Sequence, residues 1–197
     1  ILDRIATMAT NAWAKVGATL PLPKTVRPTI SLNPTYASHS GLRGSTTWAA
    51  YLPGSRGIVL LRSPESYGAG TSPVREPADD KLLIPLTHEL THLVNDDLIS
   101  VVRIPHWMSE GLAEHVADHM RTDPARNYTG ADLSLAYAHA AHGVRYFIER
   151  FGLEVFWALA REYASSRMWD RSFQQVTGVT WEAFGSDWNA WMKSRFG

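Results

Sequence analysis

The chain has 197 residues, with 19 Lys and Arg against 19 Asp and Glu, so its formal net charge is zero. Apolar residues make up 45% of the sequence, which is enough to bury a core and excludes an intrinsically disordered protein. The balanced charge argues against a nucleic-acid-binding protein, because such proteins carry a basic excess. No apolar run approaches the roughly 20 residues of a membrane-spanning helix. Because Cys is absent, disulfides, thiolate metal sites and a cysteine nucleophile are also excluded.

The first 80 residues are expected to combine one helix with a small β-sheet. Apolar residues recur at intervals of three and four over 2–18, which predicts a helix, and Pro21 and Pro23 end it. Apolar runs at 28–33, 46–52 and 58–62 predict short strands. The Pro- and Gly-containing segment between the last two strands predicts a hairpin.

After residue 80 the pattern is helical. Helices are predicted near 81–96, 105–121, 132–151, 153–167, 170–177 and 181–195. Gly152 and Gly178 stand where helix-terminating glycines belong, and Thr180 is a suitable N-cap residue. The sequence therefore predicts one α+β domain over 1–197, with a β-containing lobe over 1–80 and a helical lobe over 81–197.

Residues 88–92 form the most informative string, His-Glu-Leu-Thr-His. Two His four positions apart lie on one helix face, so the imidazoles of His88 and His92 can bind one tetrahedral metal ion. Glu89 lies about 100° around the helix from His88, where it can take a proton from metal-activated water. The alternative is a pair of helical His residues without a metal. Asp96 and Asp97, at the end of this helix, are expected to be solvated.

A catalytic zinc site needs a third protein ligand and one open position. In the pattern H-E-x-x-H-x-x-G-x-x-H that ligand is a third His, but here Asn95 and Leu98 replace the Gly and the His. Glu110 and Glu114 lie four apart on the predicted helix 105–121 and share a face. Seventeen residues separate His92 from Glu110, enough for a loop that returns to the metal.

The string HELTH followed by Trp107-x-x-Glu110-Gly111-x-Ala113-Glu114 resembles the gluzincin metallopeptidases, the clan of thermolysin and of the zinc aminopeptidases. It is most similar to the small bacterial peptidase-MA-like domains of that clan. The resemblance covers about residues 80–197, and softer similarity extends over 137–152 and 178–191. It implies a zincin-like fold, in which a small mixed β-sheet lobe with an active-site helix precedes the helical lobe.

By this resemblance, His88, His92 and Glu110 bind one Zn²⁺ per chain, and Glu89 is the general base. Glu114 is expected to hydrogen-bond a ligand His and fix its tautomer. The oxyanion donor is expected on the helix 132–151, where Tyr137 is the first choice ahead of His139, His142 and Tyr146.

The activity implied is hydrolysis of peptide bonds in a peptide or protein substrate by zinc-activated water. In this clan an edge strand pairs with the extended substrate backbone, a role that either 46–52 or 58–62 could fill. The string G-x-M-E-N, which marks aminopeptidases of the clan, is absent, so endo- and exopeptidase activity both stay open. The alternative function is a catalytically inactive zinc-binding scaffold or interaction domain.

Location and oligomeric state are left open by the sequence. The first residue is Ile1 rather than Met, which favours a processed or shortened chain from which any signal peptide is absent. Among locations, there is a small preference for an extracytoplasmic or secreted bacterial protein.

Overall fold

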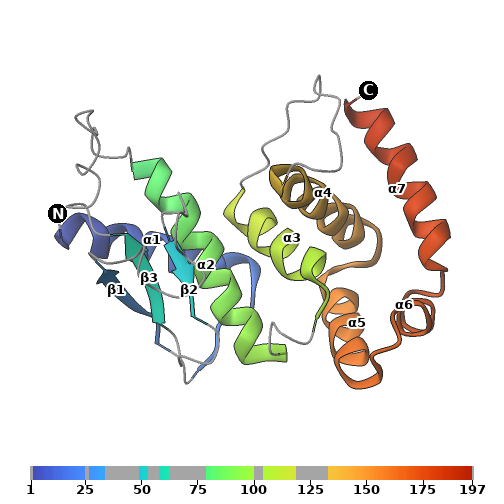
Figure 1. Ribbon diagram of the computed structural model, residues 1–197, viewed down its shortest axis with the longest axis horizontal. Coiled ribbons are helices and arrows are strands. Elements are labelled where there is room, and N and C mark those ends of the chain that lie inside the picture. The colour runs from blue at the N-terminus through green and yellow to red at the C-terminus, as the bar shows by residue number, and fades with distance from the viewer. Residues whose placement is uncertain are drawn as a thin grey trace. The chain divides into compact units, whose positions relative to one another are not determined.

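The computed structural model describes residues 2–24, 27–33, 49–52, 58–62, 79–99, 104–118 and 133–196 (Figure 1). The chain divides into two compact units, Ile1–Leu98 and Ile99–Gly197. The helix that carries His88 and His92 belongs to the first unit, whereas the sequence-based division grouped it with the helices that follow. The expectation of a single domain over 1–197 stays a prediction.

Two helices provide most of the first unit. α1 (Leu2–Thr19) buries Ile5, Met8, Ala12 and Val16 of the predicted apolar face, whereas Leu2 at its start is exposed. The helix ends before Pro21. α2 (Asp79–Ile99) is the longest helix of the first unit. Its buried apolar side chains are Leu86, Leu90, Leu93 and Val94. Their burial fixes the backbone of α2, and therefore the positions of His88 and His92 between them.

The strands of the first unit form a three-stranded sheet in the order β1-β3-β2. β1 (Thr29–Asn33) pairs in parallel with β3 (Ile58–Arg62), whereas β2 (Ala49–Tyr51) pairs with β3 in antiparallel fashion. The antiparallel pairing expected for the hairpin is therefore confirmed, although its turn at 53–57 lies outside the described residues. β3 is central, and β2 is the edge strand next to α2 (Figure 1).

The predicted fold class is wrong. An α+β fold with a zincin-like β-sheet lobe was expected, but helices dominate the part of the chain that the structure describes. Even in the first unit, α1 and α2 have 18 and 21 residues, whereas the strands have five, three and five. Strands this short present too little apolar surface to build a lobe of their own. Within the described residues, the sheet is a small addition to a mostly helical structure.

The second unit is helical throughout its described residues. It contains α3 (His106–Ala117), α4 (Leu133–Phe151), α5 (Leu153–Ser166), α6 (Trp169–Thr177) and α7 (Trp181–Phe196). These bounds confirm the predicted helices to within a few residues; the predicted end of α3 at 119–121 lies outside the described residues. Gly178 ends α6 with φ of 77°. Thr180 Oγ1 accepts a hydrogen bond from the Ala183 N–H, as expected of an N-cap residue.

The core of the second unit is aromatic. Phe147, Phe156, Phe173 and Phe184 are fully buried. Ring centroids of Phe147 and Phe173 lie 6.0 Å apart, and those of Phe173 and Phe184 lie 5.2 Å apart. Edge-to-face contacts of this kind join α4, α6 and α7 into one packed body. That body supports α4, against which α3 packs.

Candidate metal centre

α2 brings the two imidazoles of the His-Glu-Leu-Thr-His string together. His88 Nε2 and His92 Nε2 lie 3.0 Å apart, and their rings meet edge to face with centroids 4.7 Å apart. Two nitrogens bound to one tetrahedral zinc ion would be about 3.3 Å apart, given zinc–nitrogen distances of about 2.0–2.1 Å. The pair therefore already has close to the spacing that a shared metal ion requires.

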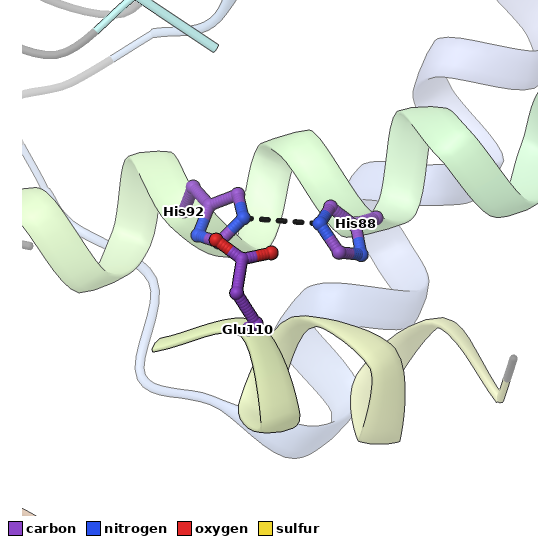
Figure 2. Close-up of side chains that lie close together, drawn as sticks. All are labelled: His88, His92 and Glu110. Carbon is purple, nitrogen blue, oxygen red and sulfur yellow. Dashed lines mark hydrogen bonds between the residues drawn. The ribbon is translucent and has the colours of Figure 1, made fainter. Parts of the chain in front are cut away.

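His88, His92 and Glu110 form a group that could hold a metal ion. One ligand atom from each residue lies within 4.8 Å of the other two, and Figure 2 shows the Glu110 carboxylate pointing toward the imidazoles. His92 is buried, whereas His88 and Glu110 are half-buried. Two imidazoles and one carboxylate are a donor set of catalytic zinc sites, so these residues fit the expected ion. The same donors also bind other first-row metals.

Glu89 is held beside the ligand pair and is not a member of the three-residue group. Its Oε2 accepts a hydrogen bond of 2.6 Å from the backbone N–H of Tyr51 in β2. A half-buried carboxylate next to two metal ligands can accept and return a proton. The arrangement therefore offers a proton-transfer group as well as a ligand group.

Glu114 is buried, with 8% of its surface exposed, and lies one turn after Glu110 on α3. Its neighbours Leu112, Ala113 and Val116 are buried as well. This burial excludes the alternative of a solvated helix glutamate. A buried carboxylate one turn from a ligand can hold an imidazole in its binding orientation.

The expected oxyanion donors all lie on α4, and the structure describes three of them. His142 is 1% exposed, and its ring centroid is 6.4 Å from that of Trp191. Tyr146 Oη accepts a hydrogen bond of 2.8 Å from Arg150 Nη1. The exposed His139 ring packs edge-on to Trp188. Tyr137 also lies in α4, but its side chain is outside the described residues, so its role stays a prediction.

Two further residues of this region were not recognised as functional from the sequence. Tyr51 Oη donates a hydrogen bond of 2.6 Å to Asp96 Oδ2, across 45 positions of the chain. Asp96 was expected to be solvated, but it is half-buried and bonded to Tyr51. Its position four residues after His92 places it on the ligand face of α2, which is the one signal that could have pointed to it.

No protein-family model, curated protein or solved structure matches the chain. The resemblance to gluzincins therefore rests on the residues of the two motifs. Within the described residues, none of the helices has the length and apolarity needed to cross a membrane.

Proposed function

We propose that this protein is a zinc-dependent peptidase of the gluzincin type, which hydrolyses peptide bonds in peptide or protein substrates. The observation that supports this most directly is the His88, His92 and Glu110 group with Glu89 beside it on the helix of the two His residues. A zinc site that served structure alone would be closed by a fourth protein ligand and would need no adjacent carboxylate.

Each residue has a separate task in this proposal. His88, His92 and Glu110 hold the ion, and Glu114 orients an imidazole among them. The chemistry that a zinc ion would supply there is a bound water with a pKa of about 7 and a polarised carbonyl group. Glu89 takes a proton from water and delivers it to the leaving amine. Tyr137 donates a hydrogen bond to the developing oxyanion.

β2 is the strand proposed to hold the substrate backbone. Among the described strands, β3 is paired on both sides, whereas β2 is paired on one side only. The Tyr51 N–H of β2 reaches Glu89, so the open edge of β2 faces the proposed general base. An extended peptide added to this edge would have its backbone held by main-chain hydrogen bonds to the remaining backbone groups of the edge, because the Tyr51 N–H is already bonded to Glu89.

The test separates ligands from base. His88→Ala, His92→Ala and Glu110→Ala should each lose zinc, because a three-ligand site cannot spare one. Glu89→Gln should keep about one zinc per chain and lose turnover, because an amide fills the same space but cannot accept the proton. Zinc content and hydrolysis of an unfolded protein substrate are measured for each variant, with Glu182→Gln on the exposed face of α7 as the control.

Three results would contradict the proposal in different ways. If zinc is lost equally in all four variants, Glu89 is a ligand and its role is wrong. A wild-type protein that binds zinc but hydrolyses no substrate would be the inactive scaffold. If the wild-type protein takes up less than about a tenth of an equivalent of zinc, the metal site itself is wrong.

A further inference from the structure

Tyr51 attaches the edge strand β2 to α2 at two points. Its backbone N–H donates to Glu89 Oε2 at 2.6 Å, and its phenol donates to Asp96 Oδ2, also at 2.6 Å. Both acceptors are carboxylates, and hydrogen bonds to ionised acceptors are short and roughly twice as strong as neutral ones. One residue of the strand thus engages two acidic residues of the helix.

The two acceptors lie far enough apart to define how the strand lies on the helix. Glu89 and Asp96 are seven residues apart, which is two turns and about 10 Å along the helix axis. His92 falls between them on the same stripe, three residues after Glu89 and four before Asp96. A single bond would let the strand pivot, whereas two bonds at this separation fix both its position along α2 and its direction.

The pairing of β2 shows which edge of the strand meets Glu89. Ala50 lies opposite Leu60 and Tyr51 opposite Val59 in the antiparallel ladder. Backbone groups of successive residues point alternately toward the partner strand and away from it. Because the Tyr51 N–H is bonded to Glu89, it points away from β3. Glu89 therefore contacts the open edge of β2, and the hydrogen bond fixes the rotation of its carboxylate.

We infer that Tyr51 is a positioning residue for Glu89, and that Asp96 acts through Tyr51 by anchoring its phenol. The inference rests on the proposed peptidase function, in which Glu89 moves the proton. A short strand is a weak support by itself: β2 has three residues, so its pairing with β3 supplies few hydrogen bonds. The Tyr51–Asp96 bond compensates for this and holds the N–H where Glu89 needs it.

The experiment removes the anchor without touching the ligands. Tyr51→Phe keeps the ring and the backbone N–H but loses the phenol hydroxyl, and Asp96→Asn tests the same bond from the other side. The matched control is Asp97→Asn, the exposed neighbouring acid of α2. For each variant, and for the double variant, zinc affinity, kcat and KM are measured on the full chain, together with hydrogen exchange of the Tyr51 amide.

Each single variant should lower kcat about tenfold, because a misplaced general base slows proton transfer. KM should change less than about threefold and zinc affinity less than about twofold. The Tyr51 amide should exchange about tenfold faster. The double variant should be no worse than the singles, because both remove one bond. Asp97→Asn should match the wild-type protein. If Tyr51→Phe does not fold, Asp96→Asn carries the same test.

Three results would overturn the inference. kcat unchanged in both variants would mean that Glu89 does not depend on the anchor. A rise in KM alone would give Tyr51 a role in substrate docking only, and a tenfold loss of zinc affinity would give it a role in supporting the ligands. If the wild-type protein has no peptidase activity, the proposed function fails separately. The contact is then decided by exchange of the Tyr51 amide, which must accelerate in Tyr51→Phe and Glu89→Ala.

Discussion

At the scale of single residues, the site contains a carboxylate whose burial has to be explained. Glu114 is 8% exposed, and an ionised carboxylate is costly to bury unless it is paired or hydrogen-bonded. It lies one turn after Glu110, on the helix that supplies the carboxylate of the candidate metal group. An imidazole that binds a metal through one nitrogen donates its other N–H to such a group. Burial and position together favour a role for Glu114 in holding a ligand His.

The first prediction follows for Glu114→Gln. Zinc affinity should fall about 10- to 100-fold, because the amide is a weaker acceptor and leaves the imidazole less firmly oriented. Competition with a chelator of known affinity measures this, with Glu182→Gln as the control for an exposed glutamate. A change of less than about twofold, with activity also unaltered, would show that the burial of Glu114 serves packing alone.

Single residues also show where the sequence was sufficient. His88 and His92 could be paired in advance because helical spacing puts both imidazoles on one face, and the resemblance to gluzincins pointed to Glu110 on the next helix. Tyr51 could not, because its bond to Asp96 spans 45 positions and depends on how a strand packs on a helix. Local spacing carries no information about such a contact, so Asp96 was assigned to solvent.

At the scale of elements, the close packing of α3 on α4 explains the glycine in the Glu110-Gly111 pair. A Cβ added at Gly111 would overlap the carbonyl oxygen of Ala140 and lie 2.6 Å from Cγ2 of Val144. The helix backbones approach too closely for any side chain at this position. Gly111, which follows Glu110, therefore sets how near α3 lies to α4.

Gly111→Ala should destabilise the protein. Alanine favours a helix over glycine by about 1 kcal/mol, but overpacking against a backbone carbonyl costs about 1–3 kcal/mol, so the clash should outweigh the gain. The midpoint temperature of thermal unfolding should fall by a few degrees. Gly185→Ala in α7 is the matched control, because nothing lies within 4 Å of the added methyl group, and it should raise the midpoint slightly. Equal effects of the two substitutions would contradict this packing.

The elements themselves were predicted unevenly. Helices such as α5 and α7 were located within one or two residues, because apolar periodicity and the glycines at 152 and 178 mark them locally. The predicted fold class was wrong because three short apolar runs were interpreted as a complete β-sheet lobe. β1 pairs with β3, although the two strands are not consecutive in the chain. Local sequence patterns do not predict such a pairing. The first unit is mostly helical because its strands are short and α2 is long.

At the scale of the whole molecule, two histidines of the second unit make the free energy of unfolding depend on pH. Burial, Arg145 and the neighbouring His139 all lower the pKa of His142 below its usual value of about 6.5. For His115, burial and Arg145 lower the pKa, and they outweigh the opposing effects of Asp118 and Glu149. Both imidazoles are therefore more basic in the unfolded chain than in the folded protein.

This difference fixes the direction of the pH dependence. The unfolded chain binds more protons than the folded protein at pH values below about 6.5, so acid favours unfolding. The contribution of His142 and His115 to stability is fully present above about pH 6.5 and is lost as the pH falls below that value. We expect the free energy of unfolding of the metal-free protein to decrease from pH 7.5 to pH 5.5, as measured by urea unfolding.

His142→Gln isolates the contribution of His142, because His142 is 1% exposed and its replacement is neutral at every pH. The variant should lose stability at pH 7.5, where the native packing around the Trp191 ring is disturbed. Its free energy of unfolding should nevertheless fall less between pH 7.5 and pH 5.5 than that of the wild-type protein. The other titratable groups are the same in the variant and in the wild-type protein, so the comparison isolates His142. An equally steep decrease in the variant would mean that His142 does not link folding to protonation.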